Sequence, residues 1–321
     1  MKAAVLHSAD SVPVCEDFDE PEAAQDAQIV DLVAAGIHQL TRSMAVGGHY
    51  GSPGTFPVIP GLNAVARTAA GDLVFTGSAK PPFGTFAERI ASPAAMRFPI
   101  PEAAQPEAVA AGVNPGIASW LPLQARLAET GTLGTVLILG VTGMSGFLAA
   151  QNARLLGASR VVGAGRSRPG LERAAAAGAQ AAALTGDRDA DARALADVLA
   201  GDAPGIVLDF VWGTVAETAF RALGRRGLNE DSADIKYVQI GALAGAEAAV
   251  PSSLLRSRKL TISGSGAGSV PAAEIKIQIP RYIELIANRS VDVPFRTFPL
   301  ADAAAAWTAS AESGPRVVLV P

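Results

Sequence analysis

The sequence predicts an α/β protein that joins a doubly wound parallel sheet to a second, β-rich domain. From about residue 114 to residue 255, short apolar runs alternate with Ala-rich or amphipathic segments of helical length. This alternation is typical of a parallel sheet covered by helices on both faces. Residues 1 to about 99 are instead dense in Pro and Gly and contain short β-like runs. A length of 321 residues also favours two domains.

We expect the β-rich domain to cover residues 1–113 and to be completed by about 256–321, with the doubly wound domain over residues 114–255. The expected sheet strands are VLILG, VVGAG, AAALT, IVLDF and YVQIG. KLTISGSG, which starts at Lys259, reads as the last strand of that sheet. An amphipathic helix near residues 273–288 and a closing strand, RVVLVP, follow, and the closing strand is expected to pack on the first domain.

The composition excludes several classes of protein. The net charge is −4, which argues against nonspecific nucleic-acid binding. No apolar run approaches the ~20 residues of a membrane span, and the N-terminus turns polar too early for a signal peptide. The single cysteine, Cys15, excludes an internal disulfide and a Cys-rich metal site. We therefore expect a soluble, cytoplasmic protein.

The segment TVLILGVTGMSG, residues 135–146, predicts a buried strand, a glycine turn and the start of a helix. Gly143 and Gly146 match the second and third glycines of the dinucleotide-binding fingerprint, and Val141 stands where the first glycine usually falls. An ordinary strand-to-helix turn is the alternative. The second strand, residues 160–164, follows at the distance of one βαβ unit, so we favour a Rossmann domain that holds a pyrophosphate at the helix N-terminus.

The end of the second strand predicts which dinucleotide is bound. NAD-preferring sites usually carry Asp or Glu there, but this chain has Gly165, Arg166, Ser167 and Arg168, with no carboxylate before Glu172. Two guanidinium groups and a hydroxyl suit the 2′-phosphate of NADPH. The alternative is a pair of solvated arginines on a surface turn.

Other cofactor contacts are expected at the carboxyl ends of the strands, where doubly wound sheets bind their ligands. The expected pyrophosphate contacts are Thr142, Gly143, Met144 and Gly146. The expected contacts to the rest of the cofactor are Val211, Trp212, Gly241, Ala242, Leu243, Gly264, Ser265 and Gly266. Simple turn chemistry is the alternative for the glycines.

Several segments together resemble one family. They are MKAAVLHS, FPVIPGLNAVAR, FGTFAERIAS, NPGIASW, the glycine turn, IVLDFVWG, YVQIGALAG and RVVLVP. In order and spacing the chain resembles, nearly end to end, the zinc-free quinone-oxidoreductase-like branch of the medium-chain dehydrogenase/reductase superfamily. The resemblance implies a GroES-like catalytic domain, a Rossmann domain, an active-site cleft between them, and a homodimer formed through the edge of the Rossmann sheet.

The positions that hold catalytic zinc in related enzymes are altered in this chain. By resemblance the first ligand position falls at His38, the usual His-Glu pair becomes Leu62 and Asn63, and a later ligand position becomes Asn114. Leucine cannot bind zinc and asparagine binds it poorly, while His38 and His49 lack a third ligand. We expect no metal. Without a Lewis acid, reduction of a quinone or an α,β-unsaturated carbonyl fits better than alcohol oxidation.

Few side chains are candidates for catalysis. Tyr50, on a loop that resembles the family's substrate loop, could donate its phenol to the substrate or pack on apolar neighbours. His49 could relay a proton or be solvated, and His38 could face the nicotinamide or be a buried histidine. Asn63 and Asn114 could orient the substrate or the carboxamide, or cap the backbone.

The sequence therefore predicts an NADPH-dependent reductase of a small-molecule quinone or enone, with no nucleic-acid or membrane partner. Two alternatives stay open. One is a biosynthetic reductase with a single dedicated enone or ketone substrate, and the other is a non-catalytic NADPH-binding protein.

Overall fold

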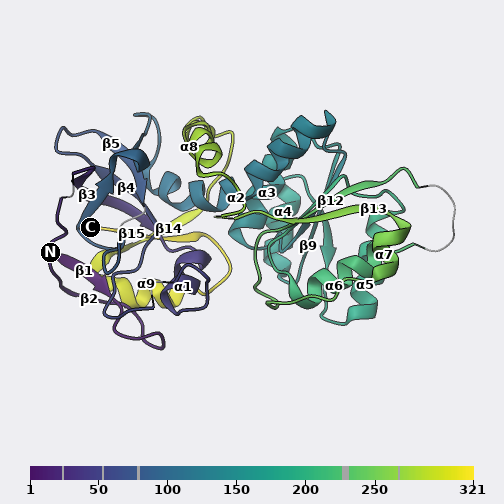
Figure 1. Cartoon of the computed structure of the whole chain (residues 1–321), viewed down its shortest axis with the longest axis horizontal. Helices are drawn as coiled ribbons and strands as arrows, with labels where there is room; N and C mark the ends of the chain where they lie inside the picture. The colour runs from purple at the N-terminus through teal and green to yellow at the C-terminus, as the bar shows by residue number, and fades with distance from the viewer. Residues whose placement is uncertain (24, 53, 78–79, 226–230, 267) are drawn as a thin grey trace. The chain divides into compact units, whose positions relative to one another are not determined.

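The computed structural model describes residues 1–23, 25–52, 54–77, 80–225, 231–266 and 268–321. They form two compact units, Met1–Pro115 with Lys276–Pro321, and Gly116–Ile275 (Figure 1). The second unit extends beyond residue 255, because strand β13 (Lys259–Gly264) pairs with the sheet of that unit. No helix among the described residues has both the length and the apolar character needed to cross a bilayer.

The first unit is built on β-sheets. Strands β1 (Lys2–Val5) and β2 (Val14–Asp17) form an antiparallel pair, and a seven-stranded sheet has the order β14-β15-β3-β4-β5-β7, with β6 paired to β3. Its strands are β3 (Ala27–Gly36), β4 (Asn63–Arg67), β5 (Leu73–Gly77), β6 (Arg89–Pro93), β7 (Phe98–Pro99), β14 (Phe295–Pro299) and β15 (Arg316–Val320). The closing strand β15 is buried in its centre because it lies between β14 and β3.

Short helices accompany these strands in the first unit. They are α1 (Gln39–Ala45), η1 (Ala94–Met96), most of α8 (Ala272–Ala287), η2 (Leu300–Asp302) and α9 (Ala303–Ala309). The long helix α2 (Pro106–Thr130) contributes residues to both units.

The second unit contains a six-stranded sheet in the order β10-β9-β8-β11-β12-β13, with every neighbouring pair parallel. Its strands are β8 (Thr135–Leu139), β9 (Arg160–Gly165), β10 (Gln180–Ala183), β11 (Ile206–Asp209), β12 (Asp234–Gln239) and β13. The order reverses between β8 and β11, which is the switch point at which doubly wound sheets bind ligands.

Helices cover both faces of this sheet (Figure 1). On β8, Val136 and Ile138 join a cluster with residues of α2, α3 (Met144–Leu155) and α4 (Arg168–Ala176), while Leu137 and Leu139 face the helices of the opposite side. Those helices are α5 (Arg188–Leu199), α6 (Gly213–Leu223) and α7 (Ser252–Ser257). A strand buried on both faces must be apolar throughout. The structure thus confirms the predicted Rossmann sheet and the separate β-rich unit.

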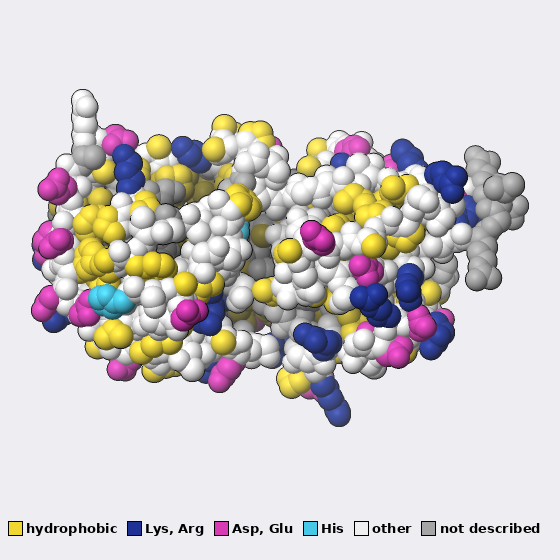
Figure 2. Space-filling view, turned by 60° about the horizontal axis from the view of Figure 1, so that its bottom comes forward, with side chains coloured by type: hydrophobic (Ala, Val, Ile, Leu, Met, Phe, Trp, Pro, Cys, Tyr) yellow, Lys and Arg dark blue, Asp and Glu magenta, His cyan; other side chains and the backbone are white. Residues whose placement is uncertain are grey.

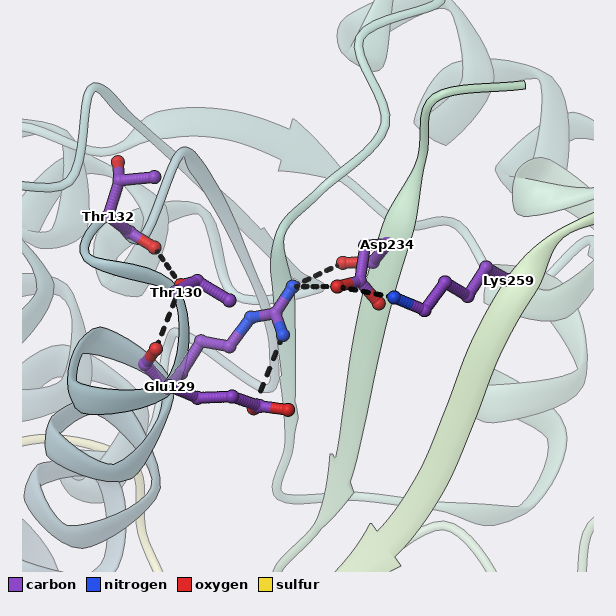
Figure 3. Close-up of polar contacts among 6 residues, drawn as sticks. Glu129, Thr130, Thr132, Asp234 and Lys259 are labelled. Atoms are coloured by element: carbon purple, nitrogen blue, oxygen red, sulfur yellow. Dashed lines mark hydrogen bonds and ion pairs between the residues drawn. The ribbon is translucent and has the colours of Figure 1, made fainter. Parts of the chain in front are cut away.

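A charged network ties the end of α2 to the amino end of β12. The Arg126 side chain is 5% exposed; its guanidinium donates to the Asp234 carbonyl at 2.5 Å and pairs with the Asp234 carboxylate at 3.3 Å. Lys259, on the neighbouring strand β13, pairs with the same carboxylate at 3.1 Å, and Glu129 pairs with Arg126 at 3.3 Å (Figure 3). The third guanidinium nitrogen, Arg126 Nε, is buried. It has no hydrogen-bond partner among the described residues.

Candidate cofactor and catalytic sites

The glycine turn between β8 and α3 is tightly packed at two of its glycines. Gly140 has a φ of +87°, and a Cβ atom there would lie 2.8 Å from Cγ1 of Val211. A Cβ on Gly146 would lie 2.3 Å from the Gly140 carbonyl oxygen. The tight turn is therefore made by Gly140, directly after the strand, whereas Val141 is fully buried. The sequence analysis gave Gly140 no role, although a glycine that directly follows a strand is a usable signal.

Gly143, the residue before α3, has space around it. A Cβ at this position would meet only the Gly140 carbonyl oxygen at 3.7 Å, an ordinary van der Waals contact. Gly143 is exposed, and as the N-cap residue it provides no side-chain cap for α3. Within the described part of the chain, the N–H groups of the first helical turn, which begins at the buried Met144, have no side-chain acceptor. Such a terminus fits a pyrophosphate.

Across the switch point, Asp209 holds the loop that follows β11. Its Oδ1 accepts the N–H groups of Val211 and Trp212 at 2.9 and 2.8 Å, and its Oδ2 accepts the Tyr237 hydroxyl at 2.6 Å. Burial raises the pKa of the Asp209 carboxyl, and these three hydrogen bonds oppose the rise. The carboxylate supports Trp212 in a left-handed conformation, with φ 53°. Sequence analysis missed Asp209, which the acidic end of IVLDF could have indicated.

The loops after β12 and β13 continue this edge. The Gly241 N–H donates to the Asp209 carbonyl at 3.1 Å, and a Cβ on Gly241 would lie 2.3 Å from the Phe210 carbonyl oxygen. The Ala244 N–H reaches the Val211 carbonyl at 2.7 Å, so the segment with Ala242 and the exposed Leu243 is joined to the β11 loop.

Gly264 has room for a Cβ. The N–H group of Ser265 donates to the Gln239 carbonyl at 2.9 Å, and the N–H group of Gly266 donates to Ser269 Oγ at 2.9 Å. The predicted cofactor residues of these three loops therefore form one continuous edge.

The end of β9 packs against the glycine turn through Thr142. A Cβ on Gly165 would lie 2.4 Å from Cγ2 of Thr142. Ser167 caps α4, since its hydroxyl accepts the Gly170 N–H at 3.3 Å. Arg166 is exposed. Arg168 is 90% exposed and pairs with Glu172 at 3.0 Å.

In the first unit, His38 is buried. Its side chain is 2% exposed, and neither ring nitrogen has a hydrogen-bond partner among the described residues. Burial, and to a smaller extent the nearby Arg316 guanidinium, lower the pKa of the imidazole from 6.5 to about 3, while the Ala110 carbonyl opposes the shift. His38 is therefore a neutral imidazole at physiological pH, and its position facing the nicotinamide stays a prediction.

The two asparagines at former zinc-ligand positions lie together. Asn114 Nδ2, on α2, donates to Asn63 Oδ1 at the start of β4, at 3.0 Å. The Asn63 carbonyl also accepts the Thr85 hydroxyl at 3.2 Å. An amide pair therefore stands at these two positions. Among the described residues, no three His, Cys, Asp or Glu side chains are grouped so that they could hold a metal ion.

Tyr50 and His49 form a ring pair on the loop after α1. Their ring centroids lie 4.0 Å apart at an interplanar angle of 34°. Tyr50 is 78% exposed. It is therefore not half-buried on apolar neighbours, which was the alternative to a role in catalysis. His49 Nδ1 accepts the Gly51 N–H at 3.0 Å, which leaves Nε2 as the protonated nitrogen of the neutral ring.

Charged side chains are mixed on the surface. On the face drawn in Figure 2, Lys and Arg side chains are interspersed with Asp and Glu. This agrees with the small net charge of −4.

Comparisons with known proteins found one curated relative and many solved structures of similar fold. No family model matches the chain. A protein of Emericella nidulans described as a probable NADPH-dependent quinone reductase, tdiC, is 32% identical over 231 residues, which are 68% of this chain and 63% of that relative. The match thus spans less than two thirds of the relative's own length.

Two solved structures cover the whole chain. The quinone oxidoreductase of Thermus thermophilus, solved alone and with NADPH, matches 100% of both chains with a TM-score of 0.81 and 26% identity. The Escherichia coli quinone oxidoreductase in complex with NADPH matches 100% of this chain and 99% of its own, with a TM-score of 0.79 and 21% identity, and supports the fold. The chain is therefore similar over its whole length to quinone oxidoreductases, which agrees with the resemblance found in its sequence.

Proposed function

We propose that the protein is an NADPH-dependent reductase that transfers hydride to a quinone or an α,β-unsaturated carbonyl without a metal. The observation that carries the proposal is the open N-terminus of α3, where Gly143 leaves room for a ligand that the protein's own packing does not fill. The relatives named as NADPH-dependent or NADPH-bound quinone reductases support the choice of cofactor and substrate.

The residues that would hold NADPH follow the carboxyl edge of the sheet. The first-turn N–H groups of α3 would bind the pyrophosphate, since a helix N-terminus favours anions. The loops that contain Val211, Gly241 and Gly264 would flank the rest of the cofactor. When bound, NADPH would supply a hydride to the substrate carbon.

The first unit would supply the polar groups for the substrate. A conjugated carbonyl needs only hydrogen-bond donors to stabilise the negative charge that develops on its oxygen. We assign this role to the exposed Tyr50 phenol, with the stacked His49 as its proton relay, and to the Asn63–Asn114 amide pair. His38 would act as a neutral group only, because the pKa of about 3 keeps it unprotonated.

The assembly and location belong to the same proposal. We expect a cytoplasmic homodimer that associates through β13, because this strand pairs with β12 on one side and stands at the end of the sheet order. The size of the particle in solution, measured by light scattering, tests the dimer.

The first test is oxidation of NADPH and NADH against quinones, enones and simple ketones, with a chelator present. We expect chelator-insensitive turnover of quinones or enones with preference for NADPH. Turnover that a chelator abolishes would contradict the metal-free mechanism. Tight NADPH binding without turnover across the whole panel would contradict the proposed substrate class.

Tyr50→Phe tests the proton donor. The exchange keeps the ring stacked on His49 and removes only the hydroxyl. We expect turnover to fall by about 10²-fold or more, the usual contribution of a general acid, with NADPH binding unchanged. A variant with wild-type turnover would remove Tyr50 from the mechanism.

A further inference from the structure

The second turn of α4 places an arginine at the glycine turn. Arg173 Nη2 donates to the Thr142 carbonyl oxygen at 3.4 Å, although the two residues are 31 positions apart. Thr142 is also the residue whose side chain packs on Gly165 at the end of β9. The Arg173 guanidinium therefore lies beside the end of β9, where Rossmann domains recognise the adenosine ribose.

Thr142 also determines which positions can carry a cofactor-binding side chain here. A Cβ on Gly170 would lie 2.5 Å from Cβ of Thr142, just as a Cβ on Gly165 would lie 2.4 Å from its Cγ2. Neither position can hold a side chain without displacing Thr142. A cation for this edge must therefore reach it from farther along α4 or from the loop between β9 and α4.

The charges of the three nearby arginines are not equally available. Arg168 is paired with Glu172 at 3.0 Å, so its charge is largely compensated. Arg173 and Arg166 form no ion pair with a carboxylate in the described part of the chain, and the group that Arg173 contacts is a neutral carbonyl. A cation without a carboxylate partner, close to a helix N-terminus, favours binding of an anion.

We propose that Arg173, together with Arg166, binds the adenosine 2′-phosphate and determines the preference for NADPH over NADH. Arg168 has the separate task of neutralising Glu172, whose free carboxylate would repel the phosphate. This inference rests on the proposed function, because it names the residues that select the cofactor of that same site.

Binding of 2′,5′-ADP and 5′-AMP to the full-length protein, measured by calorimetry, tests the inference without turnover. Arg173→Ala should weaken 2′,5′-ADP binding by about 10- to 100-fold, the effect of losing a charge-assisted hydrogen bond, and leave 5′-AMP binding unchanged. Arg173→Gln, which keeps an amide donor for the Thr142 carbonyl, should show the same loss and guards against misfolding of the alanine variant.

Two further variants serve as comparisons. Arg193→Ala removes one exposed positive charge from α5 and should leave 2′,5′-ADP binding unchanged. Arg168→Ala should weaken it by less than about threefold, as expected for an exposed ion pair.

Each outcome bears on a different claim. A wild-type protein that prefers 2′,5′-ADP, with Arg173 variants that retain this preference, overturns the role of Arg173 and leaves the proposed function intact. An Arg168→Ala loss as large as that of Arg173→Ala overturns the division of tasks between the two arginines. A wild-type protein without any preference for the 2′-phosphate overturns both the inference and the NADPH assignment.

Discussion

The two ends of the Rossmann sheet differ in how their polar groups are satisfied. At the amino ends, Arg126 and Lys259 both pair with the Asp234 carboxylate, and the Thr135 hydroxyl donates to Asp202 at 2.5 Å. At the carboxyl ends, glycines and backbone N–H groups prevail, and the first turn of α3 has no side-chain cap. Polar groups that the protein satisfies itself contribute to stability, whereas donors left without an internal acceptor are available to a ligand.

A hollow at the amino ends of the strands is no evidence for the proposed cofactor site. A cavity of about 480 Å³ lies at the amino ends, and residues of the Arg126 network line it. Its charged side chains already have partners within the chain (Figure 3). We therefore place the proposed cofactor site by the chemistry of the donors and not by the volume of the hollow.

The sharpest test compares two glycines of one turn. Gly146→Ala should lower the free energy of unfolding by about 3 kcal/mol or more, because its Cβ would overlap the Gly140 carbonyl. Gly143→Ala should change that free energy by no more than about 1 kcal/mol, while NADPH affinity falls at least about tenfold. Urea unfolding measures the free energy and calorimetry measures the NADPH affinity. A Gly143→Ala variant with wild-type affinity would contradict NADPH binding at the N-terminus of α3.

Breaking the amino-end network should affect stability alone. Arg126→Met removes the cation but keeps an apolar stem of similar length, and it leaves the Asp234 carboxylate to Lys259. We expect a loss of about 2–3 kcal/mol, from the charge-assisted hydrogen bonds of the buried guanidinium, with NADPH affinity unchanged. A fall in NADPH affinity without a loss of stability would mean that the amino end takes part in binding.

Tyr237→Phe tests Asp209, a polar group at the carboxyl ends of the strands whose hydrogen-bond partners lie within the protein. The exchange removes one hydrogen bond from the buried Asp209 and keeps the two backbone bonds to Val211 and Trp212. The expected loss of stability is about 1–2 kcal/mol, smaller than that at Arg126. Urea unfolding of Arg126→Met and Tyr237→Phe under identical conditions compares their stabilities. An equal or larger loss of stability in Tyr237→Phe would contradict the expected order.

His38 extends the comparison to a buried group whose ring nitrogens have no hydrogen-bond partner among the described residues. Its pKa is lowered from 6.5 to about 3, so between these pH values the unfolded chain binds a proton that the folded chain rejects. His38 therefore makes stability fall, as pH drops below 6.5, by up to about 1.4 kcal/mol per pH unit. His38→Leu should remove this slope between pH 6 and pH 4. Parallel stability curves for wild type and variant would show that the imidazole is protonated in the folded state.

The sequence alone determined the kind of fold and predicted where a nucleotide site would lie. Buried parallel strands are apolar throughout, and the strand–glycine turn–helix order is local, so both are visible within windows of about 20 residues. The arginines after β9 pointed to NADPH for the same reason, because their positions relative to the strand follow from the chain itself.

Only the tertiary structure decided which side chains meet. Asn63 and Asn114 are 51 residues apart, and Arg173 is 31 residues from Thr142, so no local pattern predicts their hydrogen bonds. The structure also shows that a Cβ would clash with neighbouring atoms at Gly140 and Gly146, whereas Gly143 has room for one. Steric room and pairing of charges depend on atoms brought together from distant segments, and the order of residues does not specify these distances.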